Sequence, residues 1–127
     1  MIQKGTFLNI SDNSGAKKVC CVHIYKNKKK IAKIGDLILV SVKSLRSKKR
    51  SKSKVKKGEL YKALIIRTKC FENKSQLSFC STSFFENSVI LLDKKYKLVG
   101  TRIIGPASKY FKSTKYSRII SISSSLV

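Results

Sequence analysis

The chain has 127 residues, 42% of them apolar, and its 29 Lys and Arg against 6 Asp and Glu give a formal net charge of +23. This length fits one domain, residues 1–127, that buries about two-thirds of its unfolded surface, and the apolar content excludes a disordered chain. The charge destabilises a compact state unless a polyanion neutralises it, which favours nucleic acid over an acidic protein or an anionic membrane as the partner.

The first half of the chain is typical of short strands separated by turns. Residues 6–10 are a β-prone run that ends at the turn-forming residues 11–15. Residues 18–25 follow, and strand geometry predicts two faces there. One face carries Cys20, Val22 and Ile24, and the other carries Val19, Cys21, His23 and Tyr25.

Three further runs, residues 37–42, 61–66 and 88–93, are rich in β-branched and aliphatic side chains and are bounded by turn residues. The connections are too short for the repeated helices of a parallel α/β sheet. Five short runs of this kind predict a small closed or partly closed barrel.

The C-terminal extension, residues 101–127, has a different character. Residues 100–106 predict a turn-flanked crossing segment, and residues 109–122 predict one or two short helical turns. The serine-rich residues 121–125 predict a frayed end.

Three aromatic residues are interleaved with the basic residues of this extension: Tyr110, Phe111 and Tyr116. They either stack on nucleic-acid bases or anchor the extension to the barrel. We favour anchoring, because stacking platforms usually lie on the sheet itself.

No catalytic constellation can be assembled from the sequence. His23 is the only imidazole and lies in the middle of an expected strand, while the acids are scattered, mostly at turns where they satisfy backbone donors. A metal-dependent nuclease needs several acids brought together, and no spacing suggests this. We therefore expect no enzyme, no metal and no cofactor, with a nuclease that uses Asp12 or Asp36 as the catalytic alternative.

The cysteines include no Cys-x-x-Cys pair; they are Cys20, Cys21, Cys70 and Cys80. A zinc site and a disulfide framework are therefore not supported. We expect small buried side chains in a reducing compartment.

Basic residues gather in four runs with almost no acid between them, at residues 26–33, 45–57, 94–97 and 109–118. A charge run is normally a solvated face, but four such runs make phosphate contact the better interpretation. Residues 45–57 have almost nothing to bury, so they predict an excursion from the barrel that is ordered only where phosphates neutralise it. The predicted RNA contacts in the first two runs are Lys28, Lys29, Lys30, Arg46, Lys48, Lys49, Arg50, Lys52, Lys54, Lys56 and Lys57.

Several short motifs, weak singly but in register along the chain, resemble one family. They are residues 12–18 (Asp-Asn-Ser-Gly-Ala-Lys-Lys), 34–36 (Ile-Gly-Asp), 54–59 (Lys-Val-Lys-Lys-Gly-Glu), 63–69 (Ala-Leu-Ile-Ile-Arg-Thr-Lys), 100–106 (Gly-Thr-Arg-Ile-Ile-Gly-Pro) and 118–121 (Arg-Ile-Ile-Ser). On these motifs the whole sequence resembles the universal large-subunit ribosomal protein L-fourteen family.

The resemblance implies an all-β-dominated fold, a five-stranded β-barrel with a protruding β-ribbon and short C-terminal helical segments. It also implies a structural role at the subunit interface, in contact with large-subunit rRNA and, through intersubunit bridges, with small-subunit rRNA. The implied neighbours are ribosomal proteins L-three and L-nineteen, and in many lineages a ribosome-silencing factor; no small-molecule substrate is implied. The RNA contacts carried over by motif are Lys17, Lys18, Lys54, Lys56, Lys57, Arg67, Lys69 and Arg102.

Three stretches depart from the family pattern. Residues 70–83, the expected ribbon, lack the usual Asp-Gly turn, and Ser and Lys replace a Pro-x-Gly-type turn before Lys54. Residues 123–125 are serines where a Pro-Glu pair is common, which bears on the silencing-factor and bridge contacts.

The expected location follows from composition and from the start of the chain. The Lys, Ile, Phe, Tyr and Ser content is typical of an AT-rich genome, residues 1–6 lack a signal or transit pattern, and no apolar run approaches the roughly 20 residues of a membrane helix. Together with the divergent loops, this favours a protein encoded and used in the mitochondrion (matrix, mitoribosome), with a plastid or the bacterial cytoplasm as alternatives.

The alternative from another functional class is a free single-stranded nucleic-acid-binding barrel of cold-shock type. Such a barrel carries aromatic side chains on its sheet face. The expected strands here offer mainly aliphatic side chains, with Phe7 and Tyr61 as exceptions.

Overall fold

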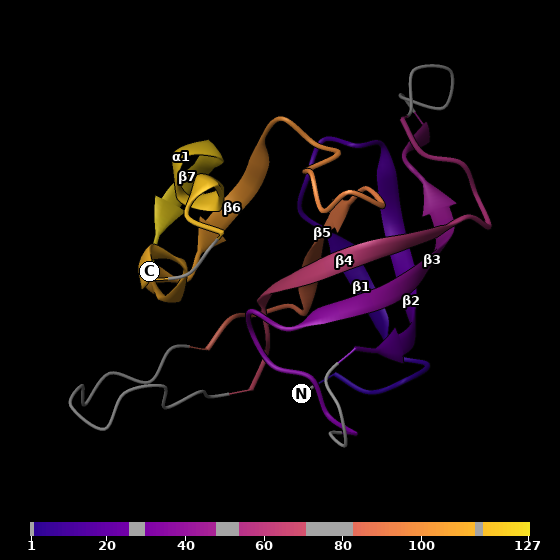
Figure 1. Cartoon of the computed structure of the whole chain (residues 1–127), viewed down its shortest axis with the longest axis horizontal. Coiled ribbons are helices and arrows are strands. Elements are labelled where there is room, and N and C mark those ends of the chain that lie inside the picture. Colours follow the sequence, from indigo (N-terminus) through magenta and orange to yellow (C-terminus); the bar gives the residue numbers. More distant parts are fainter. Residues whose placement is uncertain (1, 26–29, 48–53, 71–82, 114–115) are drawn as a thin grey trace.

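The structure is a computed structural model of the chain, and it describes residues 2–25, 30–47, 54–70, 83–113 and 116–127. Five strands form a closed barrel, and a two-stranded sheet with two short helices forms a smaller unit beside it (Figure 1). The barrel strands are β1 (Phe7–Ile10), β2 (Ala16–Ile24), β3 (Leu37–Leu45), β4 (Leu60–Arg67) and β5 (Ser88–Leu92). The small five-stranded barrel predicted from the sequence is confirmed.

The barrel closes by pairing its first strand with its last. Each strand pairs antiparallel with the next along the chain, but β1 and β5 pair parallel, with Asn9 opposite Ser88 and Ile10 opposite Val89. Closure provides every barrel strand with two neighbours, so none of the five is an edge strand.

The predicted alternation of faces in β2 is only partly correct. Val19 and Cys21 are buried, but the pairing register with β3 shifts between Cys21 and His23, and Ile24 is the next buried residue. A β-bulge inserts one residue and moves every later side chain to the other face. Ile24 is therefore in the core with Val19 and Cys21, while Tyr25 is exposed.

The C-terminal unit consists of β6 (Ile103–Ala107), the 3₁₀ helix η2 (Lys109–Ser113), α1 (Arg118–Ile122) and β7 (Ser123–Leu126). The predicted helical turns are confirmed, but the crossing segment contains a strand and the predicted fraying is wrong. β7 pairs parallel with β6, and the Val127 amide donates to the Ala107 carbonyl at 2.9 Å. A partner strand satisfies the backbone of a serine-rich segment that has no strand pattern of its own.

One hydrophobic core includes residues of both the barrel and the C-terminal unit. All five residues of β5 are buried, and Phe111 of η2 and Ile119 of α1 belong to the same cluster. Phe111 is fully buried, and the Tyr110 ring packs edge-to-face against it and lies against Gly35. The predicted anchoring role of these aromatics is confirmed for Phe111.

Candidate nucleic-acid interface

The structure places most of the described RNA-contact candidates on the surface. Arg46 is half-buried and Arg67 is buried, whereas the others are exposed: Lys17, Lys18, Lys30, Lys54, Lys56, Lys57, Lys69 and Arg102. The remaining candidates lie outside the described residues: Lys28, Lys29, Lys48, Lys49, Arg50 and Lys52. The expected β-ribbon over residues 70–83 also falls almost entirely outside the described part of the chain.

The turn between β1 and β2 holds both described ends of the basic 45–57 segment. The Gly15 carbonyl accepts the Arg46 amide at 2.9 Å, and the Ser14 carbonyl accepts the Lys54 amide at 3.1 Å. Val55 is buried in the core. The barrel itself therefore orders these two ends, and the expectation that phosphates alone order the segment is wrong for them.

These contacts bring cations from distant parts of the sequence to one corner of the barrel. Lys17 and Lys18 follow the turn directly on β2, and Arg46 and Lys54 are bonded to its two carbonyls. The Arg46 guanidinium is held in place because Nη2 donates to the Ile10 carbonyl at 3.1 Å. Residues that the sequence showed as two separate motifs thus form one basic corner, defined by Lys17, Lys18, Arg46 and Lys54.

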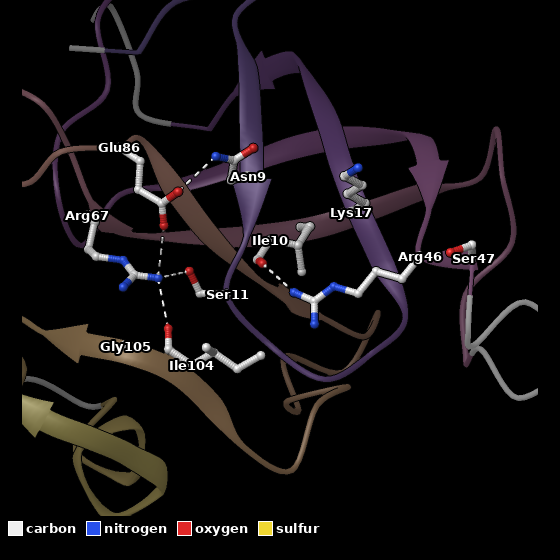
Figure 2. Close-up of a pocket in the computed structure, with 10 residues that line it drawn as sticks. All are labelled: Asn9, Ile10, Ser11, Lys17, Arg46, Ser47, Arg67, Glu86, Ile104 and Gly105. Carbon is white, nitrogen blue, oxygen red and sulfur yellow. Dashed lines mark hydrogen bonds and ion pairs between the residues drawn. The ribbon is translucent and has the colours of Figure 1, made fainter.

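Arg67, the last residue of β4, joins the barrel to the C-terminal unit (Figure 2). Its Nε donates to Ser88 Oγ at 2.6 Å, and its Nη2 donates to the Ile104 carbonyl at 2.9 Å and to Ser11 Oγ. Glu86 completes the set with a carboxylate oxygen 3.4 Å from Nη2. Burial lowers the pKa of Arg67 and Glu86 opposes that shift, and a guanidinium stays protonated in proteins. These contacts give Arg67 an internal role, and its assignment as an RNA contact stays a prediction.

Gly105 is required by this arrangement. It has a φ of +86°, and a Cβ at this position would overlap the Arg67 guanidinium. A residue with a side chain would therefore strain the backbone and displace Arg67 as well.

A cavity of about 710 Å³ opens between the basic corner and the Arg67–Glu86 pair. Figure 2 shows its lining, which comes from the ends of β1, β3 and β4, the start of β2, the residues before β5, and β6. The lining residues are Asn9, Ile10, Ser11, Lys17, Arg46, Ser47, Arg67, Glu86, Ile104 and Gly105. Asn9 and Glu86 could not be predicted as part of this site, because no motif or spacing links them to the basic runs.

Asp12 has a structural role in the turn between β1 and β2. It is buried, and its carboxylate accepts the Ser14 amide at 2.9 Å, the Leu91 amide at 2.8 Å and the Ser14 hydroxyl. Asp36 accepts the Lys33 amide at 2.9 Å in a different turn. Within the described ranges, no three His, Cys, Asp or Glu side chains are grouped so that they could hold a metal ion.

Replacement of Asp12 by Ala is expected to lower the free energy of unfolding by about 2 kcal/mol, because it leaves the buried Leu91 and Ser14 amides without an acceptor. Chemical denaturation of the purified protein measures this change. Asp36→Ala is the control, with a smaller expected loss because Asp36 is only half-buried. A loss below 0.5 kcal/mol for Asp12→Ala, typical of surface positions on the order-of-magnitude scale, would contradict the structural role.

The described cysteines are free thiols: Cys20, Cys21 and Cys70. Cys21 is buried as predicted, and burial raises the pKa of its thiol, which reduces its reactivity. Cys20 and Cys70 are only half-buried, so the prediction of buried side chains is wrong for these two. Cys80 lies outside the described residues.

The described helices are all too short or too polar to cross a membrane. Comparison with known protein families matches residues 1–127 to the family described as ribosomal protein L14p/L23e. The match covers both the barrel and the C-terminal unit. The chain therefore belongs to the ribosomal protein L14p/L23e family, a family of structural, non-enzymatic constituents of the large ribosomal subunit that associate with rRNA and ribosomal proteins.

Proposed function

We propose that this protein binds large-subunit rRNA through its exposed cations and that the basic corner is the centre of this contact. The observation that supports this proposal is that the β1–β2 turn binds the backbone of the 45–57 segment at Arg46 and Lys54. These hydrogen bonds bring Lys17, Lys18, Arg46 and Lys54 together at one place. A cluster of cations fixed on a rigid barrel neutralises several phosphates at once and releases their counterions. Lys30, Lys56, Lys57, Lys69 and Arg102 extend the contact, together with the candidates outside the described residues.

We further propose that the protein lies at the subunit interface, where it reaches small-subunit rRNA as part of intersubunit bridges. Its proposed neighbours are ribosomal proteins L-three and L-nineteen, and a ribosome-silencing factor. These proposals rest on the resemblance of the sequence to the ribosomal protein L-fourteen family. The whole chain, residues 1–127, acts in them as one domain with a basic excursion at 45–57 and a C-terminal extension at 101–127.

The proposed location is the mitochondrial matrix, on the mitoribosome. Composition typical of an AT-rich genome and the divergence of the loops support it. Sedimentation of a tagged copy through a sucrose gradient tests both role and place, with lysate of purified mitochondria beside whole-cell lysate. Comigration with the large subunit and the monosome in moderate salt is expected. Recovery only in light fractions would contradict the ribosomal role. Comigration in the whole-cell lysate but not in the lysate of purified mitochondria would contradict the location.

The 45–57 segment is expected to supply several phosphate contacts. Combined replacement of Lys48, Lys49 and Arg50 by Ala should lower affinity for large-subunit rRNA and reduce the slope of log K against log salt by about 2 to 3, since each phosphate contributes roughly 0.7–0.9. Filter binding at a series of salt concentrations measures the slope. The matched control exchanges Lys48 and Lys49 for Arg and Arg50 for Lys, which retains all three charges and should retain the slope. An unchanged slope in the alanine variant would show that these side chains stay in solvent.

A further inference from the structure

The cavity in Figure 2 combines three chemical features in one place. Lys17 and Arg46 contribute positive charge, the exposed Ile104 contributes apolar surface, and Glu86 contributes a carboxylate. Its volume of about 710 Å³ is within the roughly 300–1,000 Å³ of small-ligand sites. A nucleotide has three groups that are complementary to these features: a phosphate, a base with apolar faces, and polar base edges.

The cationic side of the cavity is suited to a phosphate. Arg46 is positioned by the bond from Nη2 to the Ile10 carbonyl, and a guanidinium has five N–H donors, so others remain for a ligand. Lys17 is exposed and lines the same cavity. An arginine fixed in this way binds phosphate oxygens with good geometry and a charge-assisted bond.

The acidic side of the cavity is not suited to a phosphate. One Glu86 oxygen accepts Asn9 Nδ2 at 2.8 Å and the other is 3.4 Å from Arg67 Nη2, yet the side chain is 42% exposed. A carboxylate has about four acceptor positions, so both oxygens retain capacity toward the cavity. A carboxylate repels the phosphate backbone, and the donors that RNA offers to it are the N–H groups of the bases and the ribose 2′-hydroxyl.

We propose that this cavity, which we name the Glu86 pocket after its carboxylate, takes one unpaired nucleotide of the rRNA. Lys17 and Arg46 bind its phosphate, Ile104 contacts the base, and Glu86 accepts donors from the base edge. The Watson–Crick edge is free only where a nucleotide is unpaired, so the pocket selects a loop or bulge over a duplex. Guanine is the preferred base, because its N1–H and N2 amino group present two adjacent donors to the two carboxylate oxygens.

The inference rests on the proposed RNA-binding function, and the test separates the two. The full-length protein is titrated at low salt into two fluorescent heptaribonucleotides, one of seven uridines and one with guanosine as the fourth of its seven residues, with anisotropy as the readout. The wild type is expected to bind the guanosine oligomer at least about fivefold more tightly, since a bidentate base contact discriminates by roughly 1–3 kcal/mol. Equal binding of both oligomers would overturn the base contact while leaving RNA binding intact.

Single substitutions test whether the preference for the guanosine oligomer arises from the Glu86 pocket. Glu86→Gln keeps the size of the side chain and should reduce the preference for the guanosine oligomer below about twofold. Binding of the uridine oligomer should be unchanged, which shows that the variant is folded. Glu59→Gln, which removes the same charge from an exposed position outside the pocket, should leave the preference unchanged. Arg46→Ala should lower the affinity for both oligomers several-fold.

Two further outcomes are decisive. A preference that persists in Glu86→Gln would overturn the pocket. Failure of the wild type to bind either oligomer, with comigration of the protein and the large subunit intact, would overturn the pocket alone, whereas failure of both experiments would overturn the proposed RNA binding as well.

Discussion

Replacement of Arg67 by Met is expected to lower the free energy of unfolding by about 3 kcal/mol or more. Removing one partner of a buried charge network costs about 3–5 kcal/mol, because the groups left behind are desolvated and unpaired. Arg67→Met leaves the Ile104 carbonyl and the Ser11 and Ser88 hydroxyls without their donor. The partial exposure of Glu86 places the loss near the lower end of that range. Urea denaturation of the variant and the wild type at the same salt concentration measures the change.

The same variant should loosen the C-terminal unit before the barrel. The Ile104 amide donates to the Ser11 carbonyl at 2.6 Å beside Arg67, so its hydrogen exchange should accelerate more than that of amides in β3. Arg67→Lys retains the charge but lacks the planar fork that reaches several acceptors at once, and an intermediate loss is expected. A change within about 0.5 kcal/mol for Arg67→Met would place it among ordinary surface positions and contradict its joining role.

Replacement of Phe111 by Ala is expected to destabilise the protein by about 3–5 kcal/mol. The ring is fully buried in the core cluster shared by the barrel and the C-terminal unit. Its removal leaves a cavity where the two parts meet, and the short helix η2 offers little chain that could collapse into it. Thermal and chemical unfolding measure the loss, and limited proteolysis followed by mass spectrometry shows whether residues 101–127 are released first.

The neighbouring residue supplies a matched control for Phe111. Tyr110 is on the same helix and has a ring of the same size, but it is 39% exposed. Tyr110→Ala should cost less than half as much as Phe111→Ala because less apolar area leaves water on folding. Equal losses at the two positions would show that burial of Phe111 is not what anchors the extension.

The strands of the barrel could be predicted because their composition and turns are local signals. Residues 37–42 and 61–66 lie within β3 and β4, and residues 88–93 exceed β5 by one residue. The bulge in β2 and the strand β7 could not be predicted in this way. Both depend on a partner strand, which fixes register and supplies hydrogen bonds that the segment itself does not encode.

The site was predictable in its charge and not in its geometry. Runs of lysine and arginine indicate a polyanionic partner, since the charge is present in any arrangement of the chain. The basic corner depends on Ser14 and Gly15 receiving Arg46 and Lys54, and the Glu86 pocket depends on a contact between Arg67 and Glu86. Contacts between residues far apart in the chain leave no periodic signal in a single sequence, and an arginine within a basic motif gives no sign that it is buried.

The parallel pairing of β1 with β5 constrains the order in which the protein can fold during its own synthesis. Asn9 is among the first residues to be made, and its partner Ser88 is added only after most of the chain. Until then β1 and β4 have open edges, and a nascent chain with unpaired strand edges is prone to aggregate. Contacts between distant segments also slow folding, because a long loop must close before they form. Completion of the core is therefore a late event, because the edges of β1 and β4 are covered only when β5 has been made.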